Sequence, residues 1–386
     1  MLKRRTPLGW LQLAHHKSRF AVAIAGVAFA GILVFMQLGF LNMLIDTTVT
    51  IHKKLDADIV LVSIDGRDMV NAGSFPRRRL LQALGVEGVA DVEALYIRNV
   101  QWIKPSDRES GAVLVLALRP DFPGFLDPEL NAQVATLTLP GSALFDVGSR
   151  GDYTAFIEEV AAGARPQTEV NGKRVTIEGL FHFGASFAAE SILLTSADTL
   201  GILDGQYDAG AVSIGLVQLA PGYDVAEVVA AINAVIGDDE TIARSREDFI
   251  DHSRSRLAVD SPISFVFSFG AVIGLIVGTV IVVQILTSDV QDHMAEYATF
   301  KAMGFKTGYL LGIVYEQSAV LTLFGFLPAL GTSLLLYEVI SAGVGMEMTM
   351  TWERVLTVLG LTIAMCAFSG TLAMRRVVAA DPAEVF

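Results

Sequence analysis

The sequence predicts a polytopic α-helical membrane protein with four transmembrane helices and a large extracytoplasmic α+β domain between helices 1 and 2. Three observations predict this fold class. The 386-residue chain is 52% hydrophobic and its mean hydropathy is +0.52, well above that of an ordinary soluble domain. The apolar residues gather in four stretches that are each long enough to cross a bilayer. The acidic residues gather in the long segment between the first two stretches.

The four apolar stretches are the predicted spans. A helix needs about 20 mostly apolar residues to cross the hydrocarbon core. The third stretch contains one acid, Glu316. Three glycines spaced four apart in the second stretch indicate a smooth face for close packing against another helix, the alternative being glycine that lipid merely tolerates. The spans are residues 19–45, 261–288, 308–337 and 355–374, and the glycines are Gly270, Gly274 and Gly278.

The N-terminal segment is predicted to stay in the mature protein. A basic start and the sequence Ala28-Phe29-Ala30 resemble a secretory signal, but the apolar run continues about fifteen residues farther, which is too long for such a signal. We therefore interpret the first span as a retained anchor. Residues 1–18 are expected to form a cytoplasmic amphipathic elbow helix, with Trp10 as a membrane-interface anchor; the alternative is a disordered basic tail.

Lysine and arginine predict the orientation of the spans, because cytoplasmic loops carry more of both. The first nineteen residues hold five basic residues and no acid, and the loop at residues 289–307 holds Lys301 and Lys306. The loop at residues 338–354 holds only Arg354. Both termini, including the tail at residues 375–386, and the 289–307 loop are therefore expected inside, with residues 46–260 outside.

Residues 46–260 are expected to form an acidic periplasmic α+β domain with its own core. They carry 32 acids against 18 Lys and Arg, a net formal charge of −14, which argues against a nucleic-acid partner. Asn171-Gly172 predicts a tight hairpin turn, and Gly237 predicts the end of a helix. Apolar runs indicate strands at residues 59–64, 112–117, 175–180 and 212–219, and helical patterns fall at residues 77–84, 153–161 and 225–236.

Catalytic and metal-binding patterns do not occur in this sequence. It contains no G-x-S-x-G, H-E-x-x-H or Walker A motif. Cys366 is the only cysteine, so neither an internal disulfide nor a cysteine-rich zinc site can form. His182 stands alone among apolar residues and is interpreted as structural. We expect a module that binds and transmits force, with no catalytic residues, no metal and no cofactor held by this chain.

The 289–307 loop is predicted to contain a short cytoplasmic helix that docks on another protein. Asp289 and Asp292 suit the start of a helix, and Gly304 suits a left-handed cap at its end. Between them, His293, Tyr297 and Lys301 recur every four residues. Exposed aromatic residues on such a helix favour insertion into a partner's groove. The alternative is a solvated connector helix.

Several stretches together resemble MacB/FtsX-type ABC transporter permeases, most closely the DevC subfamily. The strongest similarity lies in residues 284–304, which resemble the coupling region of that family. The other stretches are residues 6–13 with 36–40, residues 75–80 with 184–188, and residues 379–386. The resemblance extends over essentially the whole chain, and the four-span layout with a large first outer loop agrees with it.

The resemblance implies a homodimeric permease subunit in the bacterial inner (cytoplasmic) membrane. ATP and Mg²⁺ would bind a separate ABC ATPase subunit, and this chain would transmit force to its periplasmic domain (mechanotransmission). The implied partners are a periplasmic adaptor, or membrane fusion protein, and a TolC-like outer-membrane channel, for efflux of a lipid-like or amphipathic cargo. The residues implied to contact the ATPase are Asp292, His293, Glu296, Tyr297, Phe300, Lys301 and Gly304.

Two interpretations of Glu316 and one alternative function remain open at this stage. An acid in a span is costly and usually faces the interior of the bundle, so Glu316 could serve a dimer seam. It could also be hydrated near the inner surface or pair with Lys306.

The alternative function is an FtsX-like transmembrane regulator of a periplasmic cell-wall hydrolase, which uses the same coupling without transport. A receptor is disfavoured because the cytoplasmic segments are too short for an output domain.

Overall fold

The computed structural model describes Gly9 and residues 17–66, 71–105, 108–184, 190–237, 240–344 and 346–379. Trp10 and nearly all of the predicted elbow helix lie outside these residues. The chain divides into two compact units. The helical unit comprises residues 1–42, 262–343 and 347–386, and the α+β unit comprises residues 43–261 and 344–346.

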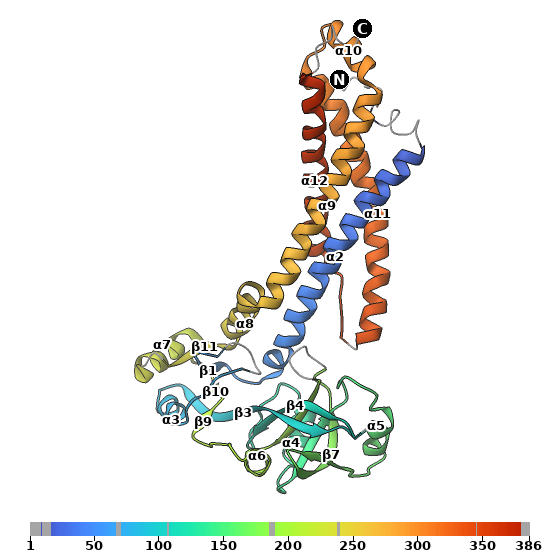
Figure 1. Cartoon of the computed structure of the whole chain (residues 1–386). Helices are drawn as coiled ribbons and strands as arrows, with labels where there is room; N and C mark the ends of the chain where they lie inside the picture. Colours follow the sequence, from blue (N-terminus) through green and yellow to red (C-terminus); the bar gives the residue numbers. More distant parts are fainter. Residues whose placement is uncertain are drawn as a thin grey trace. The chain divides into compact units, whose positions relative to one another are not determined.

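Four long helices confirm the predicted membrane architecture. Each contains a window apolar enough and long enough to cross a bilayer. A fifth, short helix lies beyond the ends of α9 and α11 (Figure 1). The helices are α2 (Lys17–Lys54), α9 (Pro262–Asp292), α10 (Met294–Ala302), α11 (Thr307–Val344) and α12 (Trp352–Ala379). The strands and shorter helices of the α+β unit lie between α2 and α9 in the chain, as predicted, and the unit also includes the last turns of α2.

The glycines of α9 pack closely against α2, which confirms the predicted small-residue face. A Cβ atom added to Gly278 would lie 2.5 Å from the Cβ of Ala30. One added to Gly274 would lie 3.2 Å from the Cβ of Leu33. Real Cβ atoms do not approach at the first distance, so only glycine allows these two backbones to come so near. This is the close approach that small residues provide between membrane helices.

The α+β unit is built on one nine-stranded mixed sheet. Its strand order is β11-β1-β10-β3-β4-β8-β5-β7-β6, and β6 pairs with the end of β3 as well. The sheet therefore curls back on itself at that end. Its strands are β1 (Ile59–Ser63), β3 (Val89–Ile103), β4 (Ser110–Leu118), β5 (Ser142–Asp146), β6 (Gln167–Val170), β7 (Lys173–Phe181), β8 (Ser191–Ser196), β10 (Ile214–Leu219) and β11 (Thr241–Ser245), and β2 (Phe75–Pro76) pairs separately with β9 (Ala211–Val212).

Both faces of this sheet are buried, each against its own core. Alternate residues of a strand point to opposite faces, so Val113 and Val115 enter one core while Leu114 and Leu116 enter the other. Burial on both faces explains why β4 reads as a continuous apolar run. The covering helices are α3 (Arg78–Leu84), α4 (Pro128–Val134), α5 (Thr154–Ala161), α6 (Ala197–Leu203), α7 (Val225–Ile236) and α8 (Arg246–Asp260).

The local signals in the sequence are confirmed at two turns. Asn171 and Gly172 have φ values of 48° and 73°, the backbone of a tight turn between the antiparallel strands β6 and β7. Gly237, with φ of 56°, follows the last residue of α7. At the other end of α7, the side chain of Asp224 accepts a hydrogen bond from the backbone N–H of Glu227 at 3.1 Å.

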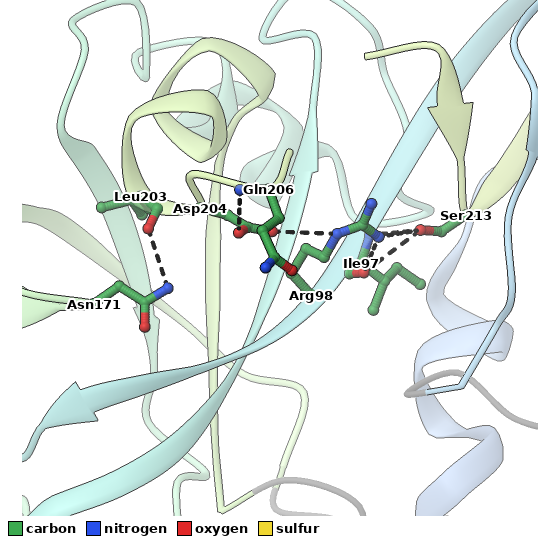
Figure 2. A network of polar contacts seen from close by, with 7 residues as sticks. All are labelled: Ile97, Arg98, Asn171, Leu203, Asp204, Gln206 and Ser213. Atoms are coloured by element: carbon green, nitrogen blue, oxygen red, sulfur yellow. Dashed lines mark hydrogen bonds and ion pairs between the residues drawn. The ribbon is translucent and has the colours of Figure 1, made fainter. Parts of the chain in front are cut away.

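A polar network holds the sheet together where β3 changes partners. Strand β3 pairs with β10 up to Leu95 and with β4 from Tyr96 onward. Figure 2 shows Arg98, just past this point, between Asp204 and Ser213. Its Nε lies 3.4 Å from Asp204 Oδ2, and its Nη1 donates to Ser213 Oγ at 3.3 Å. Arg98 thus ties β3 to the end of α6 and to the start of β10.

Replacing Arg98 by methionine is expected to destabilise the α+β unit by about 2 kcal/mol, because Asp204 would lose the partner of a largely buried carboxylate. Arg254→Met is the matched control, since the side chains of Arg254 and its partner Asp46 are 45% and 54% exposed and such exposed pairs contribute about 0–1 kcal/mol. Thermal unfolding of both variants measures the difference. Equal shifts would show that the network does not stabilise this junction.

Candidate functional site

The loop between the second and third spans folds as a short helix, α10, placed by its neighbours. Helix α9 continues to Asp292, so Asp289 and Asp292 lie in its last turns and do not start α10. That part of the prediction is wrong, because residues 287–292 contain no glycine or proline to end α9 earlier. The break falls at His293, whose Nδ1 donates to the carbonyl oxygen of Asp289 at 2.9 Å. Gly304, with φ of 88°, confirms the predicted left-handed residue after α10.

Tyr297 is an internal anchor of α10 and does not face outward. Its side chain is 1% exposed, in a core formed by neighbouring helices. The prediction that Tyr297 contacts a partner protein is therefore wrong for this conformation. Burial, together with the nearby acids Asp289 and Glu296, raises the pKa of the phenol, so Tyr297 stays neutral. The core residues around it are Val290, Leu310, Ile313, Val314 and Met374.

Two polar contacts fix the α9 end of this site to other helices. Gln317 Nε2 of α11 donates to Asp289 Oδ2 at 2.6 Å, and both residues are buried. Arg19 of α2 forms an ion pair with Asp292. Hydrogen bonds to a charged group are stronger than neutral ones, and the buried Asp289 needs such a donor. The base of α10 is therefore tied to α2 and α11 as well as to α9.

The outward face of α10 is acidic at one end and apolar at the other. Glu296, Thr299 and Met303 follow each other along α10 at helical spacing, Asp292 precedes them at the end of α9, and all four are exposed. Met303 is 60% exposed. Phe305, just beyond the Gly304 turn, is 41% exposed, and its ring centre lies 4.7 Å from that of Tyr309 in a tilted contact. We call Asp292, Glu296, Thr299, Met303 and Phe305 the α10 face.

The predicted contact residues divide between this face and the interior. Asp292, Glu296 and Gly304 are exposed. His293, Phe300 and Lys301 are half-buried, and Tyr297 is buried. Met303 and Phe305 were not singled out by the sequence reasoning, which followed the spacing of His293, Tyr297 and Lys301. The available signal was the pair of large apolar residues on either side of a glycine turn in a loop outside the membrane.

Glu316 lies on α11, half-buried, and makes no ion pair with any residue that the structure describes. Glu316 is not paired with Lys306, which was one of the alternatives that the sequence left open. The neighbouring Gln317, not Glu316, makes the buried polar contact of this helix.

Glu316→Ala is accordingly expected to change stability by less than about 0.5 kcal/mol and to leave partner binding unchanged. Thermal unfolding and co-purification with an ABC ATPase check this. Normal folding with loss of coupled ATP hydrolysis would instead assign Glu316 a function.

Comparison with known proteins identifies the C-terminal part of the chain. Residues 268–382 match the FtsX-like permease C-terminal family. The match covers α10 and most of the three long helices around it, and it supports the MacB/FtsX-type family predicted from the sequence. This FtsX-like segment and the four apolar helices indicate a multi-pass membrane protein with a permease-like role. A comparison with curated protein sequences gave no match.

Two solved structures are similar to the chain over about half its length. One is the periplasmic region of MacB from Actinobacillus actinomycetemcomitans, with 10% identity and a TM-score of 0.33, covering 50% of this chain and 91% of that one. The other is the extracellular domain of YknZ, a noncanonic ABC-type transporter from Gram-positive bacteria. It has 13% identity and a TM-score of 0.31, covering 48% of this chain and 99% of that one.

Proposed function

We propose that this chain is the permease subunit of a DevC-type, ATP-driven ABC exporter, and that a separate ATPase docks on the α10 face. The FtsX-like segment supports a permease with an ABC ATPase partner. The observation that carries the proposal is the form of α10. It presents exposed side chains on one side and is held by the buried Tyr297 on the other.

A helix held in this way can pass a displacement to the spans. The core around Tyr297 includes residues of α9, α11 and α12, and Arg19 adds a contact from α2. Packed interiors resist compression and transmit strain. A push on the α10 face would therefore move several spans together and would not be absorbed by a flexible loop. This is the physical requirement of mechanotransmission.

The spans continue into the α+β unit through α2. This helix contributes Phe35 to the core of the helical unit and Ile51 to that of the α+β unit. We propose that the α+β unit faces the periplasm, and that both termini and α10 lie in the cytoplasm, since the basic residues favour that orientation. The membrane would be the bacterial inner membrane.

The remaining assembly follows from the resemblance. We propose that two copies of the chain form a homodimer, that ATP and Mg²⁺ bind the partner ATPase, and that the α+β unit works with a periplasmic adaptor and a TolC-like channel. The cargo would be lipid-like or amphipathic. Its passage would be driven by movement of the α+β units and not by a channel through the spans.

Distance measurements between the two α+β units test this function. Cys366 is the only cysteine and is buried, so Leu81→Cys, at a position 64% exposed on α3, gives one reactive thiol per chain. We expect spin labels there to report a distance between protomers that changes when ATP is added to the complex with the ATPase. A distance that ATP leaves unchanged, although the ATPase is bound and active, would contradict mechanotransmission.

A further inference from the structure

A cavity of about 420 Å³ lies inside the α+β unit. This volume is within the range of small-molecule sites, roughly 300–1,000 Å³. Strands β1, β10 and β11 form one wall, and α8 forms the other, with the last turns of α2 between them. The lining residues that the structure describes all belong to one unit, and none of them belongs to α10 or to the FtsX-like segment.

Helix α8 turns one face toward this cavity. Phe249, His252, Ser253 and Arg256 line it, and their spacing of three, four and seven residues is that of a single helix face. On β11, Ile242 and the second residue after it, Arg244, line the opposite wall, as expected for side chains on one side of a strand. The cavity therefore has an arginine on each wall.

The two arginines make part of the cavity cationic. The Nε of Arg244 is buried and has no hydrogen-bond partner among the described residues. Arg256 donates from Nη1 to the carbonyl oxygen of Gly66 at 2.8 Å, and this acceptor is neutral. The described lining residues include no Asp or Glu, although the segment carries 32 acids. Both arginines are half-buried. A guanidinium partly removed from water is stabilised by an anion, and its geometry suits an oxyanion with two oxygens.

The rest of the lining is apolar. Val62, Ile64, Ile214 and Phe249 contribute hydrocarbon surface beside the arginines. A small, fully hydrated anion would gain nothing from this part of the wall, because apolar contact is favourable only for a ligand that has apolar surface to bury. The lining therefore favours a ligand with an anionic end and a hydrocarbon end.

We propose that this cavity binds an anionic amphiphile, a molecule with one oxyanionic head on an alkyl chain. Arg244 and Arg256 hold the head, and Val62, Ile214 and Phe249 contact the first part of the chain. A carboxylate and a phosphate share the required chemistry. The site stands on the cavity alone and does not depend on whether the chain drives export.

Calorimetric titration of the full chain in phosphatidylcholine nanodiscs tests the site, with empty nanodiscs as the blank. Octyl phosphate and octanoate are the two anionic probes, octyl glucoside is the neutral one, and inorganic phosphate lacks the alkyl chain. We expect at least one anionic probe to bind, at least tenfold more tightly than octyl glucoside or inorganic phosphate. Whichever of octyl phosphate and octanoate binds more tightly identifies the preferred head.

Variants then locate the binding. Arg244→Gln, alone and with Arg256→Gln, is expected to weaken binding about tenfold or more, the effect of losing a charge-assisted hydrogen bond. Arg254→Gln is the matched control. Arg254 lies on the same helix but outside the cavity, 45% exposed and paired with Asp46 at 3.3 Å. Thermal unfolding shows that each variant is folded.

Three results would overturn the proposal. Binding that Arg244→Gln leaves unchanged would place the ligand elsewhere. Equal binding of inorganic phosphate would show a plain anion site, and equal binding of octyl glucoside would show apolar adsorption without recognition of charge.

Discussion

Tyr297→Ala is expected to abolish productive coupling to the ATPase while leaving the α+β unit folded. Removing a buried aromatic side chain leaves a cavity and costs about 3–5 kcal/mol. The lost packing would destabilise the core that holds α10 in position, since Tyr297 is 1% exposed among residues of α9, α11 and α12. The short α10, of nine residues, is too short to be stable without that packing. We expect stimulated ATP hydrolysis, measured with a candidate ABC ATPase, to fall at least tenfold.

Tyr297→Phe separates packing from polarity. The Tyr297 hydroxyl is buried and has no hydrogen-bond partner among the described residues, so removing it costs no hydrogen bond there. The phenylalanine variant should therefore couple as well as the native chain. If alanine at this position couples normally, the anchor role is wrong. If phenylalanine fails as badly as alanine, the hydroxyl has a role that packing does not explain.

Gly278→Leu is expected to disrupt the pairing of α9 with α2. The added Cβ would lie 2.5 Å from the Cβ of Ala30 and 2.6 Å from the Sδ of Met365, so the helices must separate. Overpacking of this kind typically costs about 1–3 kcal/mol, and the clash with a short, inflexible Ala30 side chain places this site at the upper end. The expected readout is a lower midpoint of thermal unfolding for the full chain in detergent.

Gly360→Leu on α12 is the matched control for this change. Gly360 is exposed, and a Cβ there meets nothing within 4 Å. The same substitution should therefore be tolerated. Equal destabilisation by both variants would mean that leucine harms the helices generally, and that the close approach at Gly278 is not what holds α9 to α2.

The sequence predicted the features that local chemistry determines. The four apolar stretches correctly predicted the four long helices. Asn171-Gly172 correctly predicted the turn, and Gly237 the helix end, because asparagine and glycine adopt positive φ values more easily than other residues. The strands β3, β5, β8 and β11 were not predicted. Strand β3 is long and mixes charged residues such as Glu93 and Arg98 with apolar ones, because it changes partners midway and meets several environments.

The sequence predicted where the helix of the candidate site lies in the chain, but it did not predict which side of that helix faces the other helices. Periodicity placed His293, Tyr297 and Lys301 on one side of a helix, yet it cannot say whether that side faces the bundle or the solvent. Tertiary packing decides this, through contacts with α11 and α12 that lie far away in the sequence. The same limit applies to Gln317, whose partner Asp289 is 28 residues away. Glu316 drew attention by its charge, while its neighbour makes the buried contact.

Co-purification of an ABC ATPase with a variant of the α10 face tests the central claim most directly. The variant Met303→Glu/Phe305→Glu replaces two exposed apolar residues that do not belong to the core around Tyr297, and thermal unfolding shows that the helical unit stays folded, since Phe305 contacts Phe300 and Tyr309 at the edge of that core. Its control is Leu81→Glu/Leu139→Glu, which changes two apolar residues of the α+β unit that are 64% and 67% exposed. We predict that the control retains the ATPase as the native chain does, and that the α10 variant loses it. Full retention of the ATPase by the α10 variant would contradict docking on this face.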